Sequence, residues 1–127
     1  MKRALLIGLL FSTVSAVAAT KTALKDQDAI RALIGEAGGQ SDRTLLAVAG
    51  AIRNRGTLQG VYGLDNPAAL QASARLRARA ARAWSRSRTV RLNRAKYFGG
   101  AGDADYFLNA LHYHPVATEG DITFYQP

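Results

Sequence analysis

The sequence predicts a mainly α domain of the α+β class, in which a small helical body is followed by short C-terminal strands. Apolar residues recur every three to four positions through much of residues 26–88, which is the period of an amphipathic helix. Near the C-terminus, residues 122–125 alternate as in a half-buried strand. The chain of 127 residues contains no cysteine, so packing must stabilise this domain without disulfide bonds.

The N-terminal segment, residues 1–19, has the features of a secretory signal peptide. Met1-Lys2-Arg3 is basic, residues 4–14 are an apolar run, and Ala16-Val17-Ala18 is a small-residue cleavage site. The apolar run is too short to be read as a membrane span, and an uncleaved anchor is the alternative. We therefore expect a secreted or periplasmic protein in which residues 20–127 form one domain, with no stable membrane insertion after cleavage.

The first helix is expected to end at a pair of glycines. Thr22 or Asp26 is a suitable N-cap for it, and Gly38-Gly39 ends it, as glycines commonly do at helix C-termini. The spacing i, i+3, i+4 and i+7 describes its apolar face, which consists of Ile30, Leu33, Ile34 and Ala37. This pattern predicts a helix that runs to about Ala37 and buries one side.

A second helix is expected over residues 42–55. Ser41 is its N-cap, Asp42 lies in the first turn where the helix dipole favours a negative charge, and Gly56 ends it. Its apolar face consists of Leu45, Val48, Ala49 and Ile52. Small residues on this helix would allow a neighbouring helix to approach closely.

A third helix, rich in alanine and arginine, is expected over residues 68–88. Its apolar face consists of Leu76, Ala80, Ala83, Trp84 and Ser87, and another face carries Arg75, Arg79, Arg82 and Arg86. Residues 75–96 contain nine basic residues and no acidic one. Two interpretations remain open: this surface binds a polyanion, or it is a solvated face whose arginine stems cover the core.

The segments between and after these helices are less regular. Residues 57–67 have the glycines and the Asp-Asn-Pro sequence of a connector, in which Val61-Tyr62 is either a short extended piece or the wall of a groove. Asp103 is expected to cap a short helix, and residues 111–116 are expected to be extended.

Composition narrows the candidate chemistry. The net charge of +8 suits a polyanionic partner such as a cell-wall polymer, an anionic lipid or a nucleic acid. His112 and His114 would point to the same side of a strand, which is a weak signal for a metal site. The sequence contains no zinc-protease motif, phosphate-binding loop or Ser-His-Asp signature. We therefore expect no metal and no cofactor.

Glu36 is the strongest candidate for a catalytic residue. It is one of two glutamates in the chain and lies where the apolar first helix ends in glycines. The negative end of the helix dipole disfavours a charged carboxylate there, and partial burial acts in the same direction. Such an environment suits an acid that donates a proton near neutral pH, whereas the alternative is an ordinary surface glutamate near a helix end.

Two blocks of residues form a recognisable pattern. The first is Ile34-Gly35-Glu36-Ala37-Gly38-Gly39-Gln40 followed by residues 46–55, Leu-Ala-Val-Ala-Gly-Ala-Ile-Arg-Asn-Arg. The second, looser block is Gly99-Gly100-Ala101 with Gly120-Asp121-Ile122-Thr123-Phe124-Tyr125. These blocks resemble the cell-wall hydrolase family related to spore-cortex-lytic enzymes. That family has a Gly-Glu-Ala-x-Gly sequence, an Ala-Val-Ala helix ending in Asn-Arg, a Gly-Gly-Ala loop and a closing Gly-x-x-x-Phe-Tyr.

The resemblance implies a small lysozyme-like fold that cuts the glycan backbone of peptidoglycan as a muramidase or a lytic transglycosylase. The family's catalytic glutamate corresponds to Glu36, which would protonate the glycosidic oxygen and then act as a base. In a transglycosylase the muramoyl 6-hydroxyl group attacks and no second carboxylate is required, whereas retaining and inverting hydrolases use one. Asp103 and Asp105 are the loop candidates for that second carboxylate.

The other expected site residues are mainly aromatic. The family's Gly-Ala loop is followed by an aromatic patch, which here is either Asp105-Tyr106-Phe107 or His112-Tyr113-His114. The expected substrate-binding residues are Tyr97, Gly100, Asp105, Tyr106, Tyr113 and Tyr125. We expect a monomer that binds peptidoglycan glycan strands and has no specific affinity for nucleic acid. The alternative is a non-catalytic cationic envelope module that binds an anionic cell-wall polymer.

Overall fold

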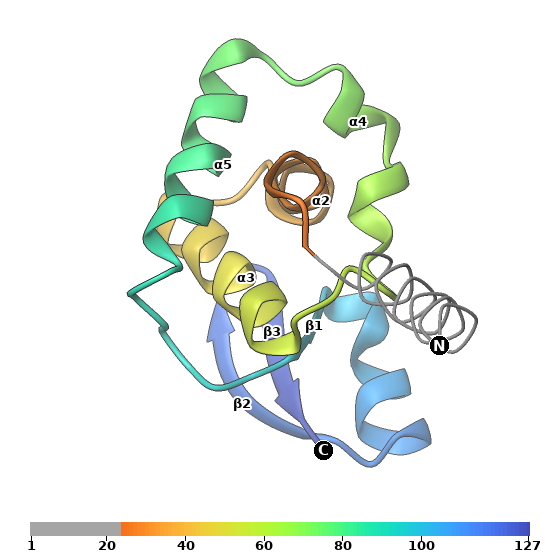
Figure 1. Ribbon diagram of the computed structural model, residues 1–127. Helices are drawn as coiled ribbons and strands as arrows, with labels where there is room; N and C mark the ends of the chain where they lie inside the picture. The colour runs from red at the N-terminus through yellow and green to blue at the C-terminus, as the bar shows by residue number, and fades with distance from the viewer. Residues whose placement is uncertain (1–23) are drawn as a thin grey trace, which may run out of the picture.

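The computed structural model describes residues 24–127, which form a mainly helical domain with one small sheet (Figure 1). The α-helices are α2 (Asp26–Ala37), α3 (Asp42–Arg55), α4 (Pro67–Leu70) and α5 (Ala74–Arg86). The other helical turns are η1 (Tyr62–Asp65), η2 (Ala101–Asp103) and the π-helical η3 (Tyr106–Ala110), and the strands are β1 (Tyr97–Gly99), β2 (His114–Glu119) and β3 (Ile122–Gln126). The predicted mainly α class with short C-terminal strands is confirmed. The expected signal peptide lies outside the described residues.

Helix α2 lies at the centre of the helical part. Figure 1 looks along its axis and shows α5 on one side of it, α4 on the other and α3 below. The helix packs against all three and against η1. Because neighbours surround it, Ala29, Ala32 and Leu33 are fully buried. The apolar face predicted for this helix is confirmed, with Ile30 at its partly buried edge.

The boundaries of α3 agree with the predicted caps, but the start of α2 does not. The Ser41 side chain accepts a backbone N–H at 3.2 Å, and Gly56 ends α3 in a left-handed conformation that glycine adopts without strain. The N-cap of α2 is Lys25, whose side chain makes no capping bond, so the prediction of Thr22 or Asp26 as the N-cap is wrong. The Asp26 carboxylate instead accepts the indole N–H of Trp84 at 2.8 Å.

The single helix predicted over residues 68–88 is divided into α4 and α5. Asn66 caps α4, and Ser73 caps α5 after a break over residues 71–73. The new cap allows the chain to change direction, so the two helices lie on different sides of α2 (Figure 1). The predicted apolar face is confirmed, since Ala80, Ala83, Trp84 and the C-cap Ser87 are buried and Leu76 is partly buried.

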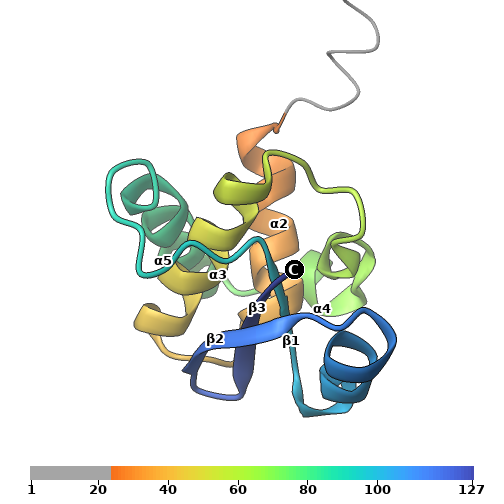
Figure 2. The same cartoon turned by 90° about the horizontal axis from the view of Figure 1, so that it is seen from below.

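The C-terminal strands form an antiparallel sheet in the order β1-β3-β2. The central strand β3 confirms the strand predicted over residues 122–125, and its Phe124 is fully buried in the helical core. Figure 2 shows the sheet against α3, with the segment of η2 and η3 beside β1. None of the helices within residues 24–127 has both the length and the apolar character needed to cross a membrane.

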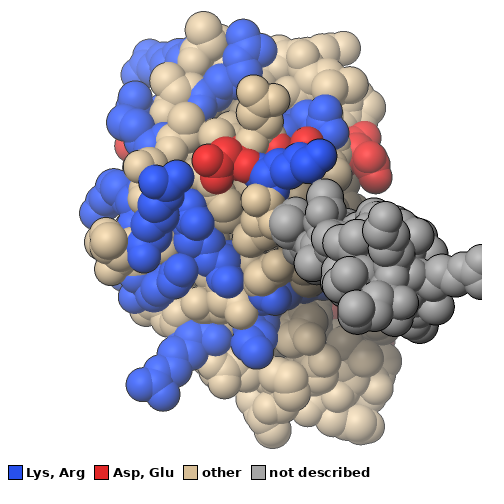
Figure 3. Space-filling model, in the orientation of Figure 1, with Lys and Arg blue, Asp and Glu red and all other residues tan. Residues whose placement is uncertain are grey.

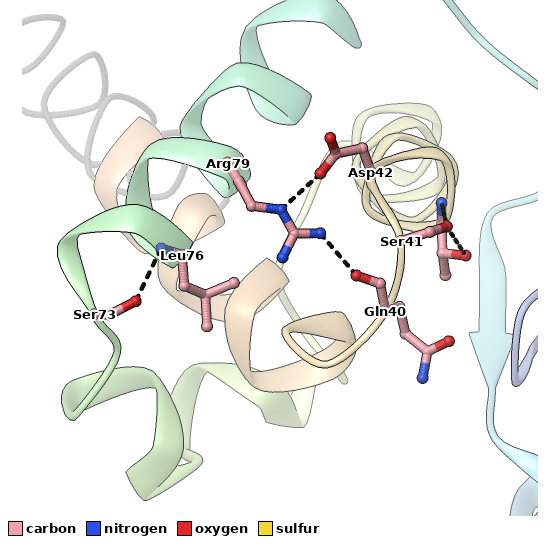
Figure 4. A network of polar contacts seen from close by, with 7 residues as sticks. Gln40, Ser41, Asp42, Ser73, Leu76 and Arg79 are labelled. Atoms are coloured by element: carbon pink, nitrogen blue, oxygen red, sulfur yellow. Dashed lines mark hydrogen bonds and ion pairs between the residues drawn. The ribbon is translucent and has the colours of Figure 1, made fainter.

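Gln40 connects the turn between β2 and β3 to the start of α3 by hydrogen bonds. Its side-chain amide donates to the Asp121 carboxylate and accepts the backbone N–H of the same residue, both at 3.2 Å. Its backbone carbonyl accepts a hydrogen bond from Arg79, which also donates to Asp42 at 2.7 Å (Figure 4). The guanidinium of Arg79 lowers the pKa of Asp42. Sheet, α3 and α5 therefore meet at one short loop.

Candidate active site

Glu36, in the last turn of α2, lines a cavity of about 260 Å³. The other walls come from the connector before α4, the end of α3 and residues 97–111. The lining side chains that bear on chemistry are Arg55, Tyr62, Tyr97, Asp103, Tyr106 and Phe107. A carboxyl group thus shares a concave surface with aromatic rings and one cation. Such a surface suits a ring-shaped polar ligand.

A backbone N–H fixes the Glu36 carboxylate. Gly63 donates to Oε1 at 2.7 Å, in the range of a charge-assisted hydrogen bond. The backbones of α2 and η1 can approach this closely because Gly35 of α2 faces Gly63 of η1. A Cβ atom on Gly63 would lie 2.6 Å from Cγ of Glu36, and one on Gly35 would overlap the Gly63 carbonyl. The glycine before Glu36 in the sequence is therefore needed for packing.

Asn66 holds the other end of η1 against α2. Its Oδ1 accepts the N–H of Ala68 at 3.0 Å and so caps α4. Its Nδ2 donates to the carbonyl oxygen of Gly35 at 3.1 Å. One side chain thus starts a helix and connects the connector to the residue that precedes Glu36.

The end of α3 is fixed by two side chains that lie away from the cavity. The Arg53 guanidinium lies 3.7 Å from the centre of the Trp84 ring and donates to the Trp84 carbonyl at 2.7 Å. Burial lowers the pKa of Arg53, and the charges of Arg88 and Arg91 act in the same direction. Asn54 binds the segment before β1, because its amide donates to the carbonyls of residues 93 and 95 at 3.2 and 3.0 Å.

Arg55 is the side chain of this turn that reaches the cavity. Its guanidinium lies 5.1 Å from the centre of the Tyr97 ring and donates to the carbonyl of Gln59. A cation over a ring face is attracted by the ring quadrupole, so the contact fixes both groups. Arg53 therefore packs on the core, Asn54 holds the segment before β1, and Arg55 places a charge on the cavity wall.

Aromatic rings pack in a row that includes the cavity wall and its support. Phe107 stacks on Tyr125 with 4.3 Å between ring centres, and Tyr113 lies 4.9 Å from Tyr97 and 6.1 Å from Phe107. The interaction of its side chain with that of Tyr97 raises the pKa of Tyr113, and burial acts in the same direction. Tyr125 is only 2% exposed, so it supports the wall from the core.

The structure brings two of the expected substrate-binding residues, Tyr97 and Tyr106, to the cavity with Glu36. The other expected residues are not among those that line it: Gly100, Asp105, Tyr113 and Tyr125. Asp105 accepts a hydrogen bond from Asn109 at 2.6 Å. Of the two candidate aromatic patches, Tyr106 and Phe107 line the cavity and Tyr113 packs behind them.

Asp103 is the second carboxylate on the cavity wall. Its Oδ2 accepts the backbone N–H of Gly100 at 3.0 Å, and the residue ends η2. The expectation that Asp103 begins a helix as its cap is therefore wrong. Glu119, the other glutamate, accepts a hydrogen bond from Arg43 at 3.0 Å and does not line this cavity.

Arg55, Gly63 and Asn66 were not predicted to be site residues. Val61-Tyr62 was predicted to be an extended piece or a groove wall, and Tyr62 does line the cavity, in a 3₁₀ turn. The signals for the missed residues were present but ambiguous. Gly63 stands in a glycine-rich connector and Asn66 precedes a proline, and such residues usually mark a turn.

The two histidines lie in different kinds of backbone. His112 has a φ of 56°, before the start of β2 at His114, so they do not lie in one strand as the metal hypothesis supposed. Within residues 24–127, no group of three or more His, Asp or Glu side chains is placed to hold a metal ion.

Comparisons of the chain with protein-family models, curated proteins and solved structures gave no match. The chemistry available at the site is that of its own residues. Glu36 can exchange a proton, Arg55 can bind an anionic or hydroxyl-bearing group, and the aromatic rings can stack on a sugar.

Proposed function

We propose that the protein is a glycosidase that cuts the glycan backbone of peptidoglycan, with Glu36 as general acid and base. The observation that carries this proposal is the Glu36 carboxylate, fixed by Gly63 and facing a cavity lined with aromatic rings. Aromatic faces suit the apolar faces of sugar rings, and a single carboxyl group suffices for proton transfer. The resemblance of the two sequence blocks to cell-wall hydrolases supports peptidoglycan as the polymer.

The reaction begins with protonated Glu36. The acid donates its proton to the glycosidic oxygen while the bond between that oxygen and the anomeric carbon breaks, and the leaving sugar departs with a hydroxyl group. The Glu36 carboxylate then accepts a proton from the attacking group. If that group is the muramoyl 6-hydroxyl, an anhydro ring forms. If it is water, the product has a reducing end. The hydrogen bond from Gly63 occupies Oε1 and leaves Oε2 for these transfers.

Asp103 is the candidate for a second catalytic carboxylate if the reaction is hydrolytic. It lines the same cavity as Glu36, whereas Asp105 does not. In an inverting hydrolase it would position water, and in a retaining one it would attack the anomeric carbon. A transglycosylase needs neither role. The response of the reaction to Asp103→Asn therefore separates hydrolysis from transglycosylation.

The decisive experiment is mass analysis of the soluble products from purified peptidoglycan. Glu36→Gln keeps the shape of the side chain but removes its proton transfer, so we expect turnover to fall by at least about 10²-fold. Glu119→Gln is the matched control and should remain active, since Glu119 pairs with Arg43 outside the cavity. Anhydromuramoyl products would indicate transglycosylation. Wild-type turnover in Glu36→Gln would refute the proposal.

The proposed location and partner follow from this reaction. Peptidoglycan lies outside the cytoplasm, so the proposal requires export, as the sequence of residues 1–19 predicts. The proposed partner is the glycan strand itself, bound by a monomer.

A further inference from the structure

A second charged surface lies away from the Glu36 cavity. We define the cationic face as the exposed basic side chains of α5 and the segment that follows it: Arg75, Arg77, Arg82, Arg86, Arg88, Arg91, Arg94 and Lys96. Figure 3 shows Lys and Arg gathered on the side of the molecule where α5 and this segment lie. No residue of 75–96 lines the Glu36 cavity, so the two surfaces can be occupied independently.

The charge of the cationic face is largely uncompensated. Within the described part of the chain, Arg88 is the member of this face that forms an ion pair, at 3.6 Å from Asp26. Arg79, on the same helix, pairs with Asp42. The pKa of Arg53 is lowered first by burial and then by the nearby charges of Arg88 and Arg91, as like charges close together require. Such repulsion destabilises the isolated domain and is relieved when a polyanion binds.

The cationic face lacks the groups that bind lipid chains or nucleic-acid bases. The exposed large apolar residues of the described chain all lie elsewhere: Tyr62, Leu70, Tyr106, Leu108 and Val116. The apolar side of α5 packs against α2 and α3, and Trp84 is only 2% exposed. A helix that inserts into a membrane needs an exposed apolar face, and a single-strand binder needs exposed rings for stacking. Neither is available.

We propose that the cationic face binds a linear, flexible phosphate polymer that carries neither bases nor acyl chains. Eight of the nine basic residues in 75–96 are arginines, whose planar guanidinium groups bind phosphate oxygens in pairs. Arg75, Arg82 and Arg86 are seven and four residues apart and so lie along one side of α5. The polymer would hold the protein in a phosphate-rich envelope layer. This proposal does not depend on the glycosidase activity.

The test measures binding of fluorescently labelled long-chain inorganic polyphosphate to the purified full chain over a range of salt concentrations. The variant Arg86→Gln/Arg94→Gln removes two exposed charges of the cationic face. Lys25→Gln/Arg43→Gln removes two charges elsewhere and gives the same net charge. We expect the first variant to bind about tenfold more weakly at low salt, with the slope of log affinity against log salt reduced by about 1.5, and the control to stay within about twofold.

Circular dichroism establishes that both variants are folded, and Arg82→Gln/Arg94→Gln replaces the first variant if it is not. Equal weakening by the two variants would overturn the proposal, because net charge alone would then explain binding. Equal or tighter binding to polyglutamate, to duplex DNA or to anionic phospholipid vesicles under the same conditions would also overturn it. The absence of polyphosphate binding at low salt would overturn it outright.

Discussion

The close approach of η1 to α2 can be tested by adding one methyl group. In Gly63→Ala the new Cβ atom would lie 2.6 Å from Cγ and 2.7 Å from the backbone nitrogen of Glu36. Both separations are well below ordinary van der Waals contact. Because α2 is enclosed by α3, α4 and α5, it cannot move aside. The η1 turn must therefore move outward by about 1 Å, and the hydrogen bond from residue 63 to Glu36 must lengthen or break.

The expected cost has two parts. Overpacking of a tight contact costs about 1–3 kcal/mol, and loss of a hydrogen bond to a charged group costs about 1.5–3 kcal/mol. Since movement of η1 relieves part of the overpacking, we expect the free energy of unfolding to fall by about 3 kcal/mol. We also expect peptidoglycan turnover to fall by about 10²-fold, because a displacement of about 1 Å misplaces the catalytic group.

Urea denaturation measures the first quantity, and release of soluble muropeptides measures the second. Gly39→Ala is the control, because a Cβ atom at Gly39 would meet nothing within 4 Å. This substitution should change stability by less than about 0.5 kcal/mol. If Gly63→Ala matches wild type in stability and in turnover, the glycine contact does not hold Glu36, and the reasoning from its geometry fails.

Asn66→Asp should retain the α4 cap but lose the bond to the α2 carbonyl. We expect a loss of about 1 kcal/mol in urea denaturation, against about 2 kcal/mol for Asn66→Ala, and equal losses would contradict the double role. The Arg79 hydrogen bond lowers the folded-state pKa of Asp42 below its ordinary 3.8. This stabilisation is present above that value and is lost as pH falls through the lower folded-state pKa, so the melting temperature of Asp42→Asn should decline less on acidification than that of wild type. If the melting temperatures of wild type and Asp42→Asn fall equally with pH, the Asp42–Arg79 pair does not contribute to stability. Tyr97→Phe should bring the raised pKa of Tyr113 back toward 10.0 in an ultraviolet titration, and an unchanged titration would contradict the influence of the Tyr97 hydroxyl.

The helices whose signals lie within a few residues could be predicted from the sequence. The period of apolar residues and the caps predicted α3 from Asp42 to Arg55 with its ends in place, and they predicted the end of α2 beside Glu36. The division of residues 68–88 was missed. Residues 71–73 contain no proline or glycine, and the alanine-rich sequence suits an unbroken helix. The break coincides with Ser73, whose side chain caps α5, and it allows α4 and α5 to pack on different sides of α2 (Figure 1).

The candidate site, like the fold, was predicted only where its features are local in the sequence. The sequence alone singled out Glu36, because a carboxylate at the end of an apolar helix beside glycines is a local feature. Only the tertiary structure decided that Gly63 binds it, 27 residues away, and that Asp103 reaches the cavity while Asp105 does not. The physical reason is that periodicity and capping act within a few residues. Distant backbones meet according to how whole side chains pack, and no short sequence pattern encodes that packing.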